Sequence, residues 1–312
     1  MTDPTPRLPT RPLFWPDVVL DLQDALINQA DSPIYIVGGA VRDAWQHKPL
    51  TDLDLATANG VKLARKIADL LGGDVFIMDA ERDVARVFID LKPGPGFPGG
   101  PFTIDVVGFR GKTLLDDLQD RDFTLNAIAV DLLGDLNHII DPLNGERDLK
   151  DKVIRACGPQ AITNDPLRAL RAIRQSAQLT ARIEPETLKA IRIADLADVS
   201  AERVRDELMK LLSTDNPVKA LRVTGALGLL DSTLPEIITM KTTSTDIPGT
   251  ATQWELALRT VEKMTGILNT ISTKRTDTTA SRFELGMIVM AMDRHRKALQ
   301  AHIGTRWPNQ RP

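Results

Sequence analysis

The sequence predicts an α+β N-terminal region followed by an all-helical remainder. Short apolar segments rich in β-branched residues alternate with loops as far as residue 141, which is typical of strands. From residue 145 onward only helical periodicity is found. The chain has 312 residues, 42% of them hydrophobic, which is enough for two or three domains with cores of their own.

Seven segments of the N-terminal region are predicted as strands, and helices are predicted over 13–30 and 59–71. Between two of the strands, residues 93–101 read PGPGFPGGP, which excludes regular structure and predicts a hairpin loop. The Pro-rich residues 1–12 are expected to be poorly ordered. The predicted strands are IYIVG (34–38), DLDLAT (52–57), DVFIMD (74–79), DVARVFIDL (83–91), FTIDVVGF (102–109), AIAVDL (127–132) and LNHIID (136–141).

Seven helices are predicted in the remainder of the chain, and polar, Thr-rich connections separate the last of them. The connections read MKTTSTDIPGTATQ (240–253) and STKRTDTTA (272–280). The predicted helices are 146–152, 164–178, 185–194, 201–213, 216–229, 252–271 and 280–301.

Composition excludes several classes of protein. Cys157 is the only cysteine, so no disulfide can form within the chain. The net charge of −3 does not indicate a globally basic nucleic-acid-binding protein. The sequence has no apolar run of membrane-spanning length, and its N-terminus has no apolar signal core. We therefore expect a cytoplasmic protein.

The segment IYIVGGAVRD (34–43) places Gly38 and Gly39 directly after a predicted strand. Glycines in this position let backbone N–H groups approach a phosphate without obstruction by a Cβ atom. A P-loop would need Gly-Lys-Ser/Thr, and a dinucleotide fingerprint would need a third glycine near residue 43. The segment has neither, so the glycines predict a phosphate-binding loop of another kind.

Asp52 and Asp54, in the strand DLDLAT, carry the strongest chemical signal. Residues two apart in a strand point to the same face, so the two carboxylates lie side by side. Such a pair favours Mg²⁺, and a metal pair could activate a hydroxyl and stabilise a leaving pyrophosphate. The alternative is a turn residue followed by a solvated strand residue. For a third catalytic carboxylate we favour Asp105 over Asp90.

Five segments in order resemble the motifs of the class II tRNA nucleotidyltransferase and bacterial poly(A) polymerase family. They extend over about 180 residues, and the ordered set is far more specific than any single member. The five segments are GGAVRDAWQHKPLTDLDLAT (38–57), DRDFTLNAIAVD (120–131), DPLNGERDLKDKVIR (141–155), NDPLRALRAIR (164–174) and SAERVRDELMKLL (200–212).

The resemblance implies a polymerase β-like nucleotidyltransferase head with a mixed sheet, followed by a helical neck, body and tail. We expect the catalytic head at 1–140, the base-reading neck at 141–215, and the body with a short tail at 216–312. The resemblance also implies Mg²⁺-dependent, template-independent transfer of nucleotides from CTP or ATP to the 3′ end of tRNA.

The second motif supplies Arg121, Asp122 and Asn126. If a helix starts here, Asp122 and Asn126 share one face, although Asp122 could also be a simple helix cap. The resemblance implies that this face receives the ribose hydroxyls and that Arg121 binds the triphosphate. A guanidinium suits phosphate because the two groups can pair through two hydrogen bonds. Arg42 is expected near phosphate, with Asp43 holding it or a neighbouring arginine.

In the fourth motif, the resemblance implies that Asp165 and Arg168 read the edge of the nucleobase. A carboxylate accepts from an exocyclic amine while arginine donates to ring nitrogen or carbonyl oxygen, a pattern that fits cytosine and adenine. Arg171 is expected on the same face or at the phosphate. Two residues depart from the family pattern: Asn164 replaces a glutamate, and His47 replaces a glycine.

Three functions compete at this point. The first is addition of C, C and A, or some of these, to tRNA. The second is a poly(A) polymerase, which the shared motifs do not separate from the first; the short C-terminal region favours tRNA. The third is a non-catalytic RNA-binding relative, which would be expected to have lost Asp52, Asp54 or Arg121, and all three are present.

Overall fold

The computed structural model describes residues 5–91 and 99–273. It divides into two compact units, which are described separately below. The first unit comprises Met1–Thr214 and Val223–Pro235, and the second comprises Asp215–Arg222 and Glu236–Pro312.

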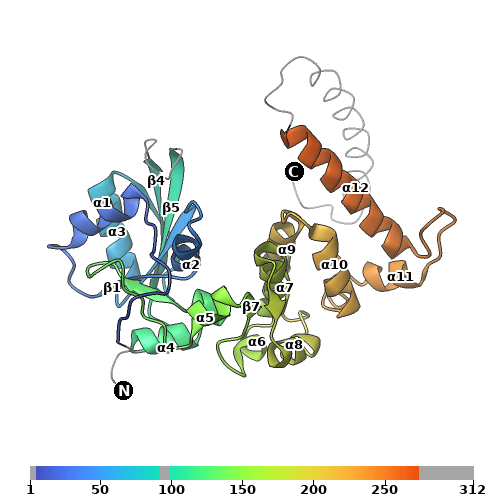
Figure 1. Ribbon diagram of the computed structural model, residues 1–312, viewed down its shortest axis with the longest axis horizontal. Helices are drawn as coiled ribbons and strands as arrows, with labels where there is room; N and C mark the ends of the chain where they lie inside the picture. The colour runs from blue at the N-terminus through green and yellow to red at the C-terminus, as the bar shows by residue number, and fades with distance from the viewer. Residues whose placement is uncertain (1–4, 92–98, 274–312) are drawn as a thin grey trace, which may run out of the picture. The chain divides into compact units, whose positions relative to one another are not determined.

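The first unit contains a mixed sheet, of which β1, β4 and β5 are labelled in Figure 1. Its six strands lie in the order β3-β4-β5-β2-β1-β6. β2 and β5 run parallel, and the other neighbouring pairs are antiparallel. The strands are β1 (Ile34–Val37), β2 (Asp52–Thr57), β3 (Asp74–Asp79), β4 (Val84–Leu91), β5 (Gly100–Gly108) and β6 (Ala129–Asp131).

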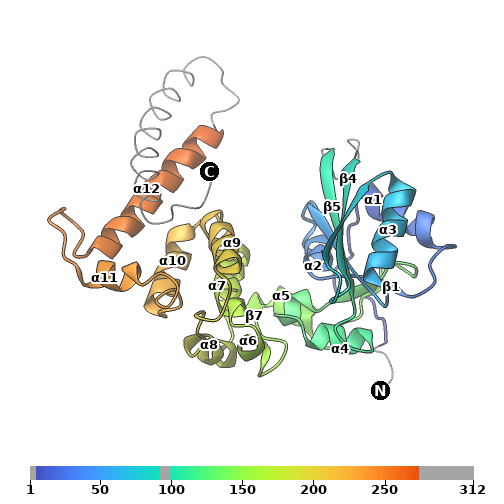
Figure 2. The same cartoon turned by 180° about the vertical axis from the view of Figure 1, so that it is seen from behind.

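Helices α1 (Asp17–Leu26) and α3 (Gly60–Leu71) cover one face of this sheet (Figures 1 and 2). Their apolar residues form the main core with alternate residues of the strands, among them Leu53 and Leu55 of β2. A smaller core on the other face joins β1 and β2 to α4 (Leu114–Gln119). Because this second core is limited to the β1–β2 end, large side chains of β3 and β4 remain exposed, including Phe76 and Phe88.

Six of the seven strand predictions match a strand, and LNHIID does not. Residues 139 and 140 form only isolated bridges, to Arg7 and to Ala129. Two residues of the predicted hairpin loop, Gly100 and Pro101, belong to β5 and pair with Leu91 and Asp90. Glycine and proline are tolerated here because they are the first residues of the strand. Residues 93–98 lie outside the described residues.

The N-terminal segment is ordered from residue 5, contrary to the expectation for residues 1–12. The Arg7 guanidinium donates to Glu146 at 2.7 Å and to Asp141 at 2.9 Å. The Glu146 carboxylate, which is almost fully buried, also accepts from Thr10 and from the Trp45 indole at 3.0 Å. The Pro-rich sequence predicted disorder. Instead, ion pairs and hydrogen bonds with residues more than 130 positions later in the chain hold the segment in place.

The remainder of the first unit is helical except for a two-stranded parallel sheet of β7 (Val153–Ile154) and β8 (Arg182–Ile183). The prediction of an all-helical remainder is wrong at β7 and β8, because strands of two residues are too short to show an alternating hydrophobic pattern in the sequence. The helices of this remainder are α5 (Gly145–Lys150), α6 (Ala161–Asn164), α7 (Leu167–Leu179), α8 (Pro185–Arg192) and α9 (Ala201–Leu212). A further helix, α2 (Gly39–Gln46), lies in the sheet domain.

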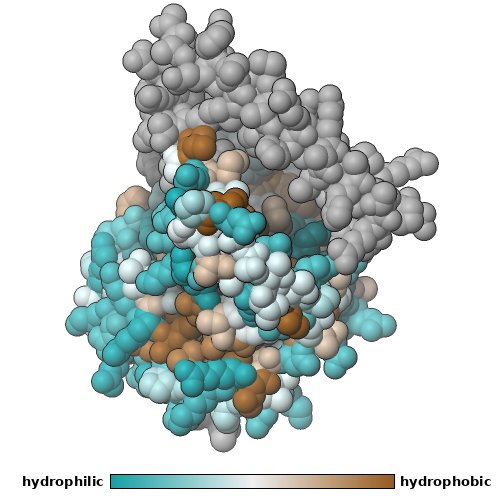
Figure 3. Space-filling model, turned by 90° about the vertical axis from the view of Figure 1, so that its right-hand side faces the viewer, coloured by the Kyte–Doolittle hydropathy of each residue, from teal (hydrophilic) through white to brown (hydrophobic). Residues whose placement is uncertain are grey.

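Helix α10 (Pro217–Ala226) contributes residues to both units, and the second unit contains α11 (Glu236–Thr242) and α12 (Gln253–Thr273). Helix α11 was missed, because its end lies in the Thr-rich segment expected to be a connection. The predicted helix 280–301 lies outside the described residues. Across residues 5–91 and 99–273, no helix is long and apolar enough to cross a membrane. The coloured surface in Figure 3 is mostly hydrophilic, with hydrophobic residues exposed in patches.

Candidate active site

Strand β2 presents Asp52 and Asp54 on one face. Leu53 and Leu55 between and after them are fully buried in the main core, so the alternation of the strand directs both carboxylates to the opposite side. In the register of β2 with β5, Asp54 lies beside Asp105 and Asp52 beside Thr103. The predicted carboxylates therefore meet on the face of the sheet that α1 and α3 leave free.

Asp54 lies in an environment that disfavours its charge. The pKa of Asp54 is raised to about 6, chiefly by burial and also by the neighbouring Asp52 and Asp105, against the opposing effects of Arg121 and the Gly39 N–H. A carboxylate held near two others in a partly desolvated place is stabilised when a cation binds there. The donor set thus fits a hard cation with oxygen ligands, such as Mg²⁺.

Asp105 is paired with an arginine that sequence reasoning missed. Arg86 of β4, directly opposite in the register, donates from Nε and Nη2 to the two Asp105 oxygens at 2.6 and 2.7 Å. Within residues 5–91 and 99–273, no three acidic, His or Cys side chains are arranged to hold a metal ion. Asp105 as a third catalytic carboxylate therefore stays a prediction. The signal for Arg86 was its polar, same-face position in VARVFIDL.

The glycine pair brings the start of α2 against Asp54. Gly38 has φ +73°, and a Cβ there would lie 2.8 Å from Asp54 Oδ2 and 3.3 Å from Arg121 Nη1. A larger residue would be both strained and in collision with the carboxylate. A Cβ on Gly39 would come within 3.3 Å of Arg42 Nη2. Gly38 is thus required by its backbone conformation and by the close approach of Asp54, whereas a Cβ on Gly39 would need only a small shift of the Arg42 side chain.

Arg121 is held by a buried carboxylate on α4. Its Nε and Nη2 donate to Asp117 Oδ2 at 3.0 and 2.8 Å, and Asp117 has no exposed surface. Two of the nitrogens are therefore committed to Asp117, while Nη1 faces Gly38 and Asp54. Sequence reasoning missed Asp117, although its i,i+4 spacing from Arg121 was a usable signal.

Asn126 is the centre of a polar network on the opposite side of Asp54 from Asp105. Its Nδ2 donates to Asp122 at 3.0 Å and to Gln175 of α7 at 3.1 Å, while its Oδ1 accepts from Arg42 at 2.9 Å. Asp43 accepts two hydrogen bonds from Arg42, at 2.9 and 3.1 Å. The expected helix start is a short 3₁₀ turn, Thr124–Asn126, which still brings Asp122 and Asn126 together.

Arg171 of α7 contacts the same network. Its Nη1 lies 3.3 Å from Asp122, and its Nε lies 3.6 Å from the buried Glu207 of α9. Although burial raises it, the pKa of Asp122 is held below its ordinary value by Arg171 and by the Asn126 amide. Asp122 is therefore a stable anion next to α7, and Gln175 and Glu207 are two supporting residues that sequence reasoning missed.

Asp165 and Arg168 do not form a close pair in this structure. The Arg168 Nε lies 3.9 Å from Asp165, and the Arg168 Nη atoms donate to the main-chain oxygens of Asp120, Arg121 and Ala161. Asp165 instead accepts from Arg203 of α9 at 2.8 Å. Both residues lie at the start of α7, but their polar groups already have partners within the protein.

The two departures from the family pattern have local structural settings. His47 adopts a left-handed conformation, with φ +57°, at the end of α2, which explains why a glycine suits this position. Its Nε2 lies 2.9 Å from the Pro12 carbonyl oxygen. Asn164 is the exposed last residue of α6 and precedes Asp165. Neither residue contacts the two β2 carboxylates through any described hydrogen bond.

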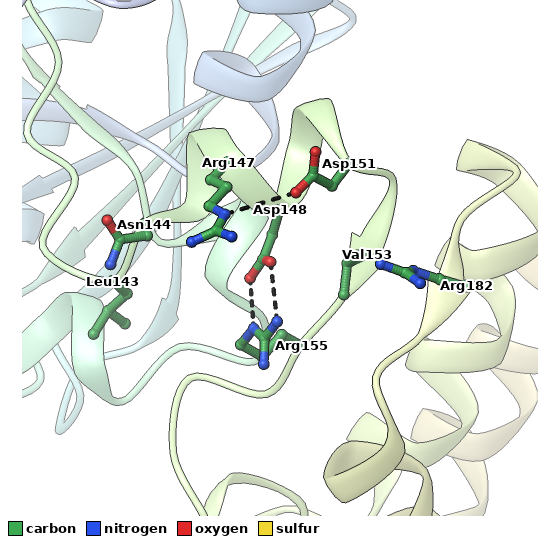
Figure 4. Close-up of a pocket in the computed structure, with 8 residues that line it drawn as sticks. All are labelled: Leu143, Asn144, Arg147, Asp148, Asp151, Val153, Arg155 and Arg182. Carbon is green, nitrogen blue, oxygen red and sulfur yellow. Dashed lines mark hydrogen bonds and ion pairs between the residues drawn. The ribbon is translucent and has the colours of Figure 1, made fainter.

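A separate pocket of about 350 Å³ lies beside α5, β7 and β8 (Figure 4). Arg147 and Arg155 point into this region and pair with Asp151 and Asp148, respectively, while Arg182 lies on the far side. None of the predicted site residues lines this pocket. The residues predicted to bind the nucleotide therefore lie elsewhere, on the open face around Asp54.

Two family models match the chain. The "Poly A polymerase head domain" matches residues 34–92 and 102–155, and the "Probable RNA and SrmB- binding site of polymerase A" matches residues 181–240. The chain belongs to the class II tRNA nucleotidyltransferase and bacterial poly(A) polymerase family. The first match includes residues of every strand from β1 to β7, and the second includes helices α8 to α10.

Known relatives agree with this membership. The chain is 40% identical over 187 residues to a CC-adding tRNA nucleotidyltransferase of Geobacter sulfurreducens, covering 59% of this chain and 41% of that one. It is also 40% identical over 218 residues to an A-adding tRNA nucleotidyltransferase of Deinococcus radiodurans, covering 65% and 45%. The chain therefore spans less than half the length of either relative.

A solved structure of a CCA-adding enzyme with ATP has a similar fold, with a TM-score of 0.64 and 28% sequence identity. The match covers 86% of this chain and 62% of the other. The family's polymerase β-like head followed by helices is the fold class predicted from the sequence, and this prediction is confirmed.

Proposed function

We propose that this chain transfers CMP or AMP from CTP or ATP to the 3′ end of tRNA without a nucleic-acid template, adding CCA or part of it. The observation that carries the proposal is the pair Asp52 and Asp54 on one open face, next to Gly38 and the anchored Arg121. This arrangement combines a cation site with a phosphate-binding loop, as nucleotidyl transfer requires.

Asp52 and Asp54 would hold Mg²⁺. The fit rests on the oxygen-only donors and on the raised pKa of Asp54, which is buried among carboxylates. When bound, the metal supplies activation of the attacking hydroxyl and stabilisation of charge on the leaving pyrophosphate. Asp105 lies next to Asp54 and holds Arg86 in the site. A catalytic role for Asp105 is therefore part of the proposal.

Nucleotide binding is assigned to the β1, β6 and neck side of Asp54. Gly38 and Gly39 offer backbone N–H groups, and Arg121 and Arg42 supply positive charge for the triphosphate. Asp122 and Asn126 suit the ribose hydroxyls as acceptor and amide. Arg171, which pairs with Asp122, supports the same pocket.

Asp165 and Arg168 are proposed to read the base edge, which would limit the substrates to CTP and ATP. In the present conformation Asp165 accepts from Arg203, and Arg168 donates to main-chain oxygens. Base recognition therefore requires that these contacts be exchanged for contacts with the nucleobase. The base should therefore bind less tightly than it would to side chains that are free before binding, since hydrogen bonds within the protein are lost when it binds.

We further propose the catalytic head at 1–140, the neck at 141–215, and the body and short tail at 216–312 as an RNA-binding region, in a cytoplasmic protein. A CC-adding and an A-adding relative are equally similar at 40% identity. The extent of addition, whether CC, A or CCA, therefore has to be measured. A poly(A) polymerase is the second candidate, because both matching family models are named after polymerase A.

The decisive experiment offers a tRNA that lacks its 3′ terminus together with Mg²⁺ and labelled CTP, ATP, GTP or UTP in turn. We expect incorporation of C, A or both in a defined number, with little G or U. Equal use of all four nucleotides would contradict the proposal, as would no use of any. Long A tracts on an unstructured RNA would identify a poly(A) polymerase, and RNA binding without nucleotide consumption would identify a non-catalytic relative.

A further inference from the structure

The catalytic face of the sheet continues beyond the carboxylates into an exposed aromatic surface. Phe76 of β3 and Phe88 of β4 are 60% and 44% exposed, although phenylalanine is a residue that proteins normally bury. Both belong to the half of the face that the small core at β1, β2 and α4 does not cover. We call these two side chains the aromatic platform.

Strand register places the platform relative to Asp52 and Asp54. Phe88 pairs with Thr103, which pairs with Asp52, so these three residues form one row across the sheet. With strands about 4.8 Å apart, Phe88 lies about 10 Å from Asp52.

A second row runs in parallel through Asp54, Asp105, Arg86 and Phe76. Phe76 and Phe88 are therefore diagonal neighbours, at a spacing of about 7–8 Å that aromatic side chains can bridge. The alternate residues of the same strands, such as Val87 and Ala85, point into the main core. The platform thus faces the same side as the carboxylates.

We infer that Phe76 and Phe88 form a stacking subsite for the unpaired nucleobases at the 3′ end of the acceptor RNA. The inference rests on the function proposed above and names a binding site for the second substrate. Any nucleobase has a π-face, so an aromatic platform can bind a single strand without reading its sequence. This property suits a growing 3′ end, whose last bases change after each addition.

The sheet order distinguishes the acceptor from the incoming nucleotide. Gly38, Arg121 and Asn126 lie on the β1, β6 and neck side of β2, whereas β5, β4 and β3 extend to the other side. A nucleotide held on the first side presents its phosphate to Asp54 and leaves the second side free. The attacking 3′ end therefore approaches over β5 and β4, across Phe88.

Charges near the platform favour stacking over phosphate binding. Arg86 is already neutralised by its two hydrogen bonds to Asp105, and Asp74 and Asp90 of β3 and β4 project to the same face. A surface of this kind does not attract the RNA backbone, so its contribution to affinity should depend little on salt. Binding through lysine or arginine contacts would instead weaken steeply as salt rises.

The first test compares steady-state kinetics of the parent protein with the double variant Phe76→Ala/Phe88→Ala on a tRNA that ends in unpaired nucleotides. We expect the KM for the acceptor to rise about tenfold or more, as loss of base stacking predicts. The KM for CTP or ATP should stay unchanged. Phe88→Tyr, which keeps an aromatic ring, should behave like the parent, and an unchanged acceptor KM in the double variant overturns the inference.

The second test measures binding without any nucleotide, by fluorescence anisotropy. One RNA carries normal unpaired 3′ bases, and its twin carries abasic nucleotides at those positions. The parent should bind the normal RNA more tightly, and the double variant should bind both equally. Because no catalysis is needed, this test still decides on the platform if the parent incorporates no nucleotide. Equal binding of both RNAs by the parent overturns the inference.

Phe14→Ala is the matched control, since Phe14 is 52% exposed but lies before α1 and next to His47. It should change neither the acceptor KM nor the preference for normal over abasic RNA. Sedimentation of the parent and double variant completes the design. If the double variant loses self-association and keeps its affinity for RNA, the platform is an interface between copies of the chain, and the inference is wrong.

Discussion

The two sides of Asp54 are built by different means. On the β5 and β4 side, hydrogen-bonded strand register alone puts Asp105 and Arg86 in line with Asp54. On the neck side, buried carboxylates and amides hold each charged group, as Asp117 does for Arg121 and Gln175 does for Asn126. The first side depends on the backbone, whereas the second depends on single side chains, so point substitutions should affect the two sides differently.

The largest expected effect comes from Asp54→Asn on the strand side. Removal of one of the two carboxylates proposed to hold Mg²⁺ should lower nucleotide incorporation by about a thousandfold or more. Binding of RNA should be retained, because the β2 backbone and its buried leucines are unchanged. Asp90→Asn, which alters an exposed carboxylate on the same face, should keep nearly full activity in the same incorporation assay.

The same variant should be more stable than the parent when metal is absent. Because burial keeps the folded-state pKa of Asp54 at about 6, above its unfolded value of 3.8, the native state binds the extra proton. Stability conferred by that proton is present below about pH 4 and is lost as pH rises to about 6. At pH 7.5 with EDTA, Asp54→Asn should raise the free energy of unfolding by about 1–3 kcal/mol. Equal stability at pH 7.5 would contradict the assigned burial.

Gly38→Ala should come next, because it disturbs the point where both sides meet. The new Cβ would lie 2.8 Å from the Asp54 carboxylate, in a backbone conformation that disfavours side chains. We expect activity to fall about a hundredfold, through displacement of Asp54 and Arg121, and the protein to lose about 1–3 kcal/mol of stability. Gly72→Ala is a useful control, since Gly72 also has positive φ but has open space around it, and it should cost stability without a comparable loss of activity.

Asp117→Asn should weaken the neck side alone. Arg121 would lose its buried charged partner, which we expect to cost about 3 kcal/mol of stability. The KM for CTP or ATP should rise about tenfold, while the acceptor KM stays the same. A variant that raised the acceptor KM instead would show that Arg121 serves the RNA and not the nucleotide.

The smallest effect is expected for Gln175→Leu. It removes one of two acceptors for the Asn126 amide and should cost about 1 kcal/mol in stability. If Asn126 contacts the ribose, the preference for CTP over 2′-deoxy-CTP should fall about three- to tenfold. Gln178→Leu, on the exposed part of the same helix, is the control and should leave this preference intact.

The strand side could largely be predicted from the sequence. On the neck side the sequence predicted Arg121, Asp122 and Asn126, but not the residues that hold them in place. Period-2 alternation in DLDLAT fixed the common face of Asp52 and Asp54, because a strand has only two faces. Arg86 was the exception, since only the register of β4 against β5 identifies its partner. Gln175 and Glu207 could not be found, because they meet Asn126 and Arg171 only after segments 49 and 36 residues apart, respectively, have folded together.

Other errors had the same origin. The small strands β7 and β8 pair across about 30 residues and are too short to have a period of their own. LNHIID has a strand-like pattern, but its neighbours provide only isolated bridges. The local sequence pattern therefore predicted the strands with long hydrogen-bond ladders. It failed where strand formation depends on pairing with a segment far away in the sequence.

The anchored N-terminal segment has an evolutionary consequence. Arg7 and Thr10 serve a carboxylate that belongs to the third family motif, and Glu146 has no other charged partner among its described ion pairs. A homologue that loses Arg7 would keep a costly unpaired anion in its interior, so selection should remove or replace Glu146 as well. Positions 7 and 146 are therefore expected to covary across homologues, even though the family's first motif begins some thirty residues after Arg7.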